Sequence, residues 1–205
     1  MIAPVKVTHI PLAAQRVVPW KDGGGTTREV AIDPPGADAT RFRWRVSLAS
    51  VARDGPFSRF PGVDRRLWLV RGAGMVLSID GRERRLERPL EAVDFAGELP
   101  VAARLLDGPT EDLNLMVARG ALGAWDLTEL RLGAGESRAS RSVLEGQELV
   151  LALRGSVRVS APGASPLLLA EGDALRADQA EGERGWRFEA AGGEALVLRF
   201  GFSPP

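Results

Sequence analysis

The stretch Leu67-Trp68-Leu69-Val70-Arg71-Gly72-Ala73-Gly74-Met75-Val76-Leu77-Ser78 joins two short apolar runs through an Arg-Gly break. A similar stretch, Val150-Leu151-Ala152-Leu153-Arg154-Gly155-Ser156-Val157-Arg158-Val159-Ser160, lies in the second half of the chain. Self-similarity over such a distance is typical of duplicated architectures. We therefore predict two copies of one structural unit, over residues 1–120 and 121–205.

The apolar runs throughout the chain are short and are separated by Gly, Pro and Asp. Met75–Ile79 meets Asp80-Gly81, a dipeptide typical of a two-residue β-hairpin. Closely spaced short strands indicate a sandwich or barrel, and no segment shows a sustained helical period. We therefore predict an all-β fold with little helix. A chain of 205 residues is long enough to bury a substantial core in such units.

Composition narrows the possible classes of protein. Hydrophobic residues make up 44% and charged residues 26%, as in ordinary soluble domains. No run of about eighteen apolar residues and no secretory leader are visible, so we expect no membrane span and a cytoplasmic location. Cysteine is absent, which excludes disulfides, thiolate catalysis and cysteine-bound zinc.

His9 is the only histidine, and one imidazole cannot supply the ligand sets of catalytic zinc or iron sites. A serine-triad mechanism would also have to use this one residue. The run 5–10 predicts a strand, in which we expect His9 to face solvent or to be hydrogen-bonded. We therefore predict neither a metal nor another cofactor.

Charge is balanced over the whole chain but not along it. Residues 15–66 hold ten basic and six acidic side chains, whereas 121–205 hold nine basic and twelve acidic ones. This surplus is too weak for nucleic acid, since proteins that bind it carry basic stripes or a high pI. A small anionic molecule is the better expected partner of the positive region.

The segment Pro19–Val30 carries three consecutive glycines, which let the backbone take positive φ and let other groups approach closely. It is neither a P-loop nor a dinucleotide fingerprint, because Lys21 precedes the glycines and no helix follows. In one interpretation the amides of Gly24, Gly25 and Thr26 form an anion-binding nest. In the other, the segment is a tight turn that lets two strands cross.

Polar and apolar residues alternate through Phe42–Ala49, and this period of two predicts a half-buried strand. The alternation aims Arg43, Arg45 and Ser47 toward the same face. A polar face beside an open glycine loop is difficult to explain by packing, since desolvated polar groups need partners. We therefore interpret this strand and the loop as parts of one binding site.

Five segments, in this order, resemble the HutD/Ves family: Pro19–Glu29, Trp44–Ala49, Asp54–Ser58, Phe60–Arg65 and Gly108–Met116. The resemblance implies a double cupin, that is, two fused RmlC-like jelly-roll β-barrels, without the His-rich metal motif of catalytic cupins. Members of the family are associated with histidine utilisation, as regulators rather than pathway enzymes. Cupin barrels that pair through their sheet edges suggest a homodimer by analogy.

The resemblance and the charge together predict the site. Arg45 would clamp a ligand carboxylate through its planar fork, and Lys21 would add a point charge. Trp20 and Phe57 would wall the pocket against water. No residue is assigned a catalytic role. The ligand-binding residues that we predict are Trp20, Lys21, Asp22, Gly24, Gly25, Thr26, Arg45, Ser47, Phe57 and Asn114.

Asp22 departs from the family, which usually carries Asn there, and an acceptor-only carboxylate alters what the loop can bind. Four further charged residues of the matched segments are interpreted as salt-bridged scaffolding rather than as ligands. They are Arg28, Asp54, Asp64 and Arg65. Only the first unit contains the glycine loop, so we expect the second unit to be structural.

We expect a protein that binds a small carboxylate of the urocanate or N-formylglutamate type and modulates histidine utilisation without catalysis. A metal-independent hydrolase or isomerase acting on the same acids is an alternative, with Lys21 and either Asp22 or Asp54 as acid and base. A structural or protein-interaction module is the third hypothesis, and an exposed apolar patch would support it.

Overall fold

The computed structural model describes residues 6–38, 41–141, 144–161, 165–178 and 185–205. These residues form nineteen strands and one short 3-10 helix, η1 (Leu12–Ala14). Within these ranges no helix has the length and apolar character needed to span a membrane. The chain divides into two compact units. The first unit is Gln15–Ala121, and the second unit is Leu122–Pro205 together with the N-terminal segment that ends at Ala14.

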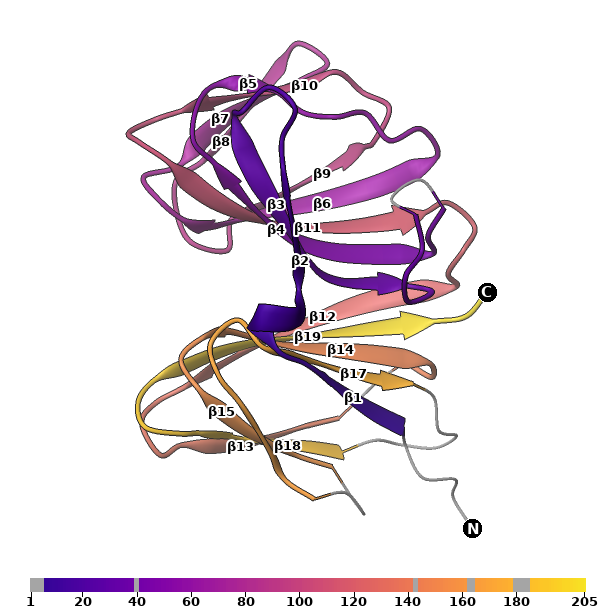
Figure 1. Cartoon of the computed structure of the whole chain (residues 1–205), viewed down its shortest axis with the longest axis vertical. Helices are drawn as coiled ribbons and strands as arrows, with labels where there is room; N and C mark the ends of the chain where they lie inside the picture. The colour runs from indigo at the N-terminus through magenta and orange to yellow at the C-terminus, as the bar shows by residue number, and fades with distance from the viewer. Residues whose placement is uncertain (1–5, 39–40, 142–143, 162–164, 179–184) are drawn as a thin grey trace. The chain divides into compact units, whose positions relative to one another are not determined.

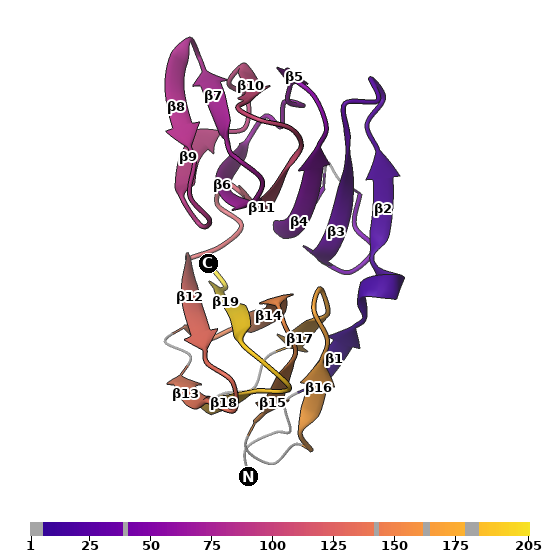
Figure 2. The same cartoon turned by 90° about the vertical axis from the view of Figure 1, so that its left-hand side faces the viewer.

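Two antiparallel sheets build the first unit (Figure 1, Figure 2). The larger sheet has six strands in the order β2-β3-β4-β11-β6-β9, and the smaller has four in the order β5-β10-β7-β8. The strands are β2 (Arg16–Pro19), β3 (Gly25–Asp33), β4 (Trp44–Val51), β5 (Gly55–Pro56), β6 (Val63–Arg71), β7 (Met75–Ile79), β8 (Arg82–Leu86), β9 (Ala92–Ala96), β10 (Val101–Leu105) and β11 (Thr110–Ala118).

The core of the first unit lies between these two sheets. Leu67 and Leu69 on β6 pack in one buried cluster with Met75 and Leu77 on β7. Strand geometry sends every second side chain to the same face, so the apolar alternation of each strand builds this cluster. Full burial of one such side chain contributes about 2 kcal/mol.

The second unit repeats the plan. A five-stranded sheet has the order β1-β17-β14-β19-β12, and a four-stranded sheet has the order β13-β18-β15-β16. The strands are β1 (Lys6–Ile10), β12 (Ala124–Leu132), β13 (Ser137–Arg141), β14 (Gln147–Arg154), β15 (Val157–Ser160), β16 (Leu167–Leu169), β17 (Ala174–Asp178), β18 (Gly185–Ala190) and β19 (Ala195–Ser203). A second buried cluster, which includes Val150, Trp186 and Phe188, fills the space between the two sheets.

The eight strands from β4 to β11 and the eight from β12 to β19 take corresponding places. The row β4-β11-β6-β9 corresponds to β12-β19-β14-β17, and β5-β10-β7-β8 corresponds to β13-β18-β15-β16. A β-bulge interrupts β6 beside Arg71 and interrupts β14 beside Arg154, at the two Arg-Gly pairs of the repeated stretch. The duplication and the all-β class predicted from the sequence are confirmed.

Two details differ from the expectations. The N-terminal strand belongs to the second unit, because β1 pairs with β17 at the edge of that unit's five-stranded sheet. Asp173 holds this N-terminal segment in the second unit. It accepts a hydrogen bond from the Leu12 backbone at 2.8 Å and lies 3.1 Å from His9 Nε2. His9 is thus a hydrogen-bonded strand residue, as expected. Neither unit is a closed barrel, since no ladder of the described strands joins its larger sheet to its smaller one.

Candidate functional site

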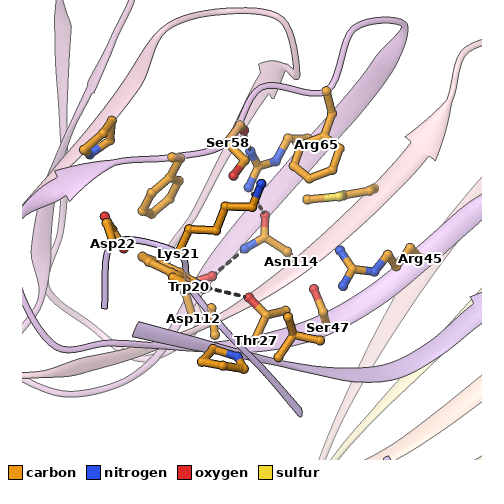
Figure 3. A pocket seen from close by; sticks show the side chains of 17 residues that line it. Trp20, Lys21, Asp22, Thr27, Arg45, Ser47, Ser58, Arg65, Asp112 and Asn114 are labelled. Carbon is orange, nitrogen blue, oxygen red and sulfur yellow. Dashed lines mark hydrogen bonds between the residues drawn. The ribbon is translucent and has the colours of Figure 1, made fainter. Parts of the chain in front are cut away.

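A cavity of about 410 Å³ lies on the six-stranded sheet of the first unit (Figure 3). This volume is in the range of small-molecule sites, which are mostly apolar with a few placed polar groups. The cavity is lined by Val18, Pro19, Trp20, Lys21, Asp22, Thr27, Arg45, Ser47, Ala49, Pro56, Phe57, Ser58, Phe60, Arg65, Asp112, Asn114 and Met116.

Two central strands, β4 and β11, provide the floor of the cavity. Each contributes three alternate residues, because the side-chain period of a strand is two. The six residues are Arg45, Ser47, Ala49, Asp112, Asn114 and Met116. The antiparallel register sets Asn114 opposite Ser47 and Met116 opposite Arg45. Polar side chains from two strands therefore meet on one face of the sheet.

β4 is buried on both faces, whereas the sequence predicts a half-buried strand. Val46 is fully buried on one face, and on the other Arg45 and Ser47 are only 6% and 2% exposed. Arg43 does not join them, because it precedes the strand, is half-exposed and pairs with Asp33. The polar groups on the cavity side of β4 are thus enclosed, and enclosed polar groups need partners.

Arg45 is oriented by a carboxylate that does not line the cavity. Its Nε donates to Glu29 Oε2 at 2.8 Å, and the same oxygen lies 3.6 Å from Arg16 Nη2. The terminal nitrogens of Arg45 point toward the cavity (Figure 3), where no described residue hydrogen-bonds them. The charge of Arg45 is therefore already compensated, while its terminal N–H groups remain available to a ligand.

Arg65 is a second buried guanidinium, on β6. Its Nη2 donates to Asn114 Oδ1 at 2.8 Å and its Nη1 to the Ser58 carbonyl at 3.2 Å. Three phenylalanine rings surround it, the nearest being Phe95 with its centroid 4.8 Å from Cζ. Burial lowers the pKa of Arg65 to about 10. Among the described residues, no acidic side chain lies within ion-pairing distance of this cation.

Asp112 is completely buried at the end of a hydrogen-bond chain that begins at Arg65 (Figure 3). Asn114 connects the two charges, because its Nδ2 donates to Asp112 Oδ1 at 2.5 Å. The other oxygen, Oδ2, has no hydrogen-bond partner in the described part of the chain. Burial raises the pKa of Asp112 to about 7, against the opposing positive charge of Arg65. The cavity thus contains a carboxyl group that changes protonation near neutral pH.

The turn between β2 and β3 forms one wall of the cavity. Trp20 packs edge-to-face on Phe57, with ring centroids 6.0 Å apart, and its Nε1 donates to Thr27 Oγ1 at 2.8 Å. Lys21 extends from the same turn into the cavity (Figure 3). No described acidic residue pairs with its ammonium group. Lys21, from this turn, and Arg45, from β4, therefore approach the same space.

The structure brings seven of the ten predicted residues together and leaves three outside. Those lining the cavity are Trp20, Lys21, Asp22, Arg45, Ser47, Phe57 and Asn114. Gly24, Gly25 and Thr26 do not line it. Whether the seven residues bind a ligand stays a prediction.

The predicted anion-binding nest is not formed. The Gly24 amide already donates to Asp22 Oδ1 at 2.9 Å, and Thr26 lies within the β-ladder. Gly25 is required for a different reason, because a Cβ there would lie 2.3 Å from the Ser50 carbonyl oxygen. The glycines therefore make a tight hairpin turn that allows β3 to pass close to β4, which is the alternative interpretation.

Sequence reasoning missed two buried charges of the site, Arg65 and Asp112. Arg65 is not salt-bridged scaffolding, because it faces the cavity with Asn114 as its partner. Asp112 lies two residues before Asn114 on β11 and therefore shares its face. Applying the period of two outward from Asn114 would have found it. Asp64 does fit the scaffolding role, since it pairs with Arg119 at 2.8 Å.

The other two scaffolding candidates also lie outside the cavity lining. Arg28 Nη1 donates to Gln15 Oε1 at 2.5 Å. Asp54 accepts a hydrogen bond from the Leu105 backbone at 2.8 Å, which ties the loop before β5 to the end of β10. Both residues thus stabilise the frame around the site.

Comparison with known sequences finds relatives for this chain. A model of the HutD family matches residues 13–198. An uncharacterized 21.2 kDa protein in the hutC 3' region of Pseudomonas putida is 41% identical over 101 residues, which cover 49% of this chain and 53% of that protein. Protein Ves of Cronobacter sakazakii is 42% identical over 101 residues, covering 49% of this chain and 54% of Ves. The match thus spans about half the length of these curated relatives.

Solved structures extend the likeness to nearly the whole chain. A conserved protein of unknown function from Pseudomonas aeruginosa PAO1 has a TM-score of 0.87 at 32% identity, covering 97% of this chain and 99% of that one. HutD from Pseudomonas fluorescens SBW25 has a TM-score of 0.74 at 27% identity, covering 96% and 99%.

A more distant structure shows the fold alone. A cupin 2 conserved barrel domain protein from Leptotrichia buccalis has a TM-score of 0.54 at 14% identity, covering 92% of this chain and 89% of that one. Its likeness agrees with the two jelly-roll units, which together make a double cupin. With the family match over most of its length, this chain belongs to the HutD family.

Proposed function

We propose that this protein binds a small carboxylic acid in the cavity of its first unit and so modulates histidine utilisation, without catalysing a reaction. The observation that carries the proposal is Arg65, a buried guanidinium that faces the cavity and has no described acidic partner. Asp112 reaches this cation only through Asn114. A buried cation without a direct ion pair is costly, and a ligand carboxylate would reduce that cost.

Two further groups support a carboxylate ligand. Lys21 adds a second cation without a described acidic partner, and Arg45 offers its terminal N–H groups in the fixed orientation set by Glu29. Charge-assisted bonds of this kind are stronger than those between neutral groups. The Trp20 wall would shield them from water and so strengthen them further.

Urocanate and N-formylglutamate are the ligands that we propose to test first. Both are compact acids, and small-molecule sites have volumes of this order. The name of the Pseudomonas putida relative places that protein beside hutC, and HutD of Pseudomonas fluorescens SBW25 is known from a structure in a formate condition. Formate is itself a carboxylate.

Titration calorimetry with each acid tests the proposal. We expect binding to the native protein and a loss of at least about tenfold in affinity for Arg65→Met, which keeps the length of the side chain and removes its charge. Arg82→Met, on the exposed strand β8, is the matched control and should bind as the native protein does. Unchanged affinity in Arg65→Met would remove this guanidinium from the site and with it the main support for the proposal.

One observation favours an enzyme as the second candidate. The raised pKa of Asp112, about 7, suits a general acid or base working near neutral pH. Incubation of chelator-treated protein with N-formylglutamate, followed by NMR, would detect hydrolysis or isomerisation. Turnover that disappears in Asp112→Asn would support the enzyme, and an unchanged spectrum would support binding alone.

The homodimer stays a prediction that light scattering would test.

A further inference from the structure

The duplicated strands give cavity residues of the first unit equivalent positions in the second. In the larger sheets β6 corresponds to β14 and β11 corresponds to β19, with the two bulges in register. Arg65 on β6 and Glu148 on β14 precede the bulge of their strand by the same number of residues, so their positions are equivalent. Asn114 corresponds to Arg199 by the same count. The second unit therefore also places charged groups at the centre of its sheet, but with a carboxylate where the first unit has its cation.

Glu148 is a fully buried carboxylate with both of its oxygens paired. Oε1 accepts a hydrogen bond from Arg199 Nη1 at 2.7 Å, and Oε2 accepts one from Trp186 Nε1 at 2.7 Å. A guanidinium and an indole N–H thus hold the carboxylate from two sides. Such an arrangement is typical of the way a protein holds a small acid.

Arg199, only 1% exposed, is fixed by further contacts. Its Nη2 donates to Thr128 Oγ1 at 2.8 Å and to the Arg141 carbonyl at 3.0 Å, and it lies 3.8 Å from Asp126 Oδ2. Thr128 stands opposite Arg199 on β12 in the same way that Ser47 stands opposite Asn114 on β4. The group around Arg65 and Asn114 in the first unit and the group around Glu148 and Arg199 in the second unit are the two buried polar centres. Equivalent positions on equivalent strands therefore build both of them.

The two centres differ in how their buried cations are compensated. In the first unit Arg65 has no described acidic partner, whereas in the second unit Glu148 completes the pair from within the chain. We propose that the second unit contains a latent site for a short monocarboxylate, such as acetate, in which the Glu148 side chain occupies the place of the ligand. This proposal does not depend on the function proposed for the first unit.

Replacing Glu148 by Ala tests the proposal, because it removes a CH₂–COO⁻ group, which has the size of acetate. Arg199 then remains buried without its main carboxylate, and such a loss is strongly destabilising. We expect the apparent melting temperature to fall by about 10 °C in sodium chloride. Acetate that enters the vacated space would restore part of this stability by mass action.

The measurement is thermal unfolding in about 100 mM sodium acetate and in sodium chloride of equal ionic strength. We expect acetate to raise the melting temperature of Glu148→Ala by about 4 °C more than it raises that of the native protein, as a tenfold excess over Kd predicts. The response of the native protein reports on the cavity of the first unit, so failure of either proposal can be recognised separately.

Two variants serve as controls. Glu148→Gln fills the space with a neutral side chain and should show no extra response to acetate. The double variant Glu148→Ala with Arg199→Met removes the cation and should show none either. Equal acetate responses in Glu148→Ala and the native protein would overturn the proposal. If Glu148→Ala does not fold in chloride, refolding from urea in acetate replaces the melting experiment, and failure to refold there also overturns it.

Discussion

Asp112 makes the stability of the first unit depend on pH, and the substitution Asp112→Asn should remove its contribution. The raised pKa of Asp112 means that the folded protein holds a proton that the unfolded chain releases. Below about pH 4 the carboxyl is protonated in both states and contributes no difference. As pH rises from there toward 7, only the unfolded chain loses its proton, so the free energy of unfolding falls. Above pH 7 both states are ionised and the decline stops.

The size of the effect follows from the two pKa values. The pKa is 3.8 in the unfolded reference and about 7 in the folded protein. One pH unit corresponds to about 1.4 kcal/mol, so the decline amounts to no more than about 4 kcal/mol. Asn avoids the burial of a charge but also removes the attraction between Asp112 and Arg65. We therefore expect the variant to gain up to about 4 kcal/mol over the native protein at pH 8 and little at pH 4.

Urea unfolding at pH values from 4 to 8, at constant ionic strength, measures this difference directly. The exposed residue Asp107 offers a matched control, because Asp107→Asn removes the same charge without changing a buried position. Its unfolding free energy should follow that of the native protein across the range. Two results would refute the reasoning: a stability gain of Asp112→Asn over the native protein that does not grow from pH 4 to 7, or a variant that is less stable than the native protein at pH 8.

Three further predictions concern the stability of the two units. Gly25→Ala should destabilise the first unit by at least about 2 kcal/mol in urea unfolding, because its Cβ would meet the Ser50 carbonyl; an equally stable variant would show that β3 can move away from β4. Leu67→Ala should cost about 3 kcal/mol through the cavity it leaves in the buried cluster, and a loss below about 1 kcal/mol would contradict that packing. Asp173→Asn should destabilise the second unit more at pH 7 than at pH 3. Burial acts to raise the pKa of Asp173, yet the backbone hydrogen bonds that it accepts, the first from Leu12, and its contact with His9 outweigh burial and lower it. Its stabilisation is therefore present above about pH 4 and lost as pH falls through the lower folded value; an equal loss at both pH values would contradict this role.

Much of the fold follows from local patterns in the sequence. Short alternating runs and the repeated Arg-Gly stretch predict two all-β units, and the structure places Arg71 and Arg154 at equivalent bulges. The membership of β1 in the second unit could not be predicted in this way. Its pairing with β17 joins residues far apart in the sequence, and a pattern of alternation does not specify a distant partner.

The position of the cavity could be predicted from the sequence, but the state of its buried charges could not. Arg45 and Ser47 lie on β4 and Asn114 lies opposite Ser47 on β11, so the side-chain period of two places all three on one face. Strand periodicity and the order of the segments were enough to predict this. The roles of Arg65 and Asp112 depend on burial and on the hydrogen bonds through Asn114, which the sequence does not reveal. The glycine run was ambiguous for a similar reason, because a close approach between strands and an anion nest require the same residues.

The hairpin of β2 and β3 lies outside the eight strands that the two units share. It carries Trp20, Lys21 and Thr27 to the cavity, while the floor comes from shared strands such as β4 and β11. Turn residues tolerate replacement better than central strands do. Substitutions in the turn of this appended hairpin should therefore change the lining of the cavity while the shared strands keep their packing, so the shape of the cavity can evolve separately from the double framework.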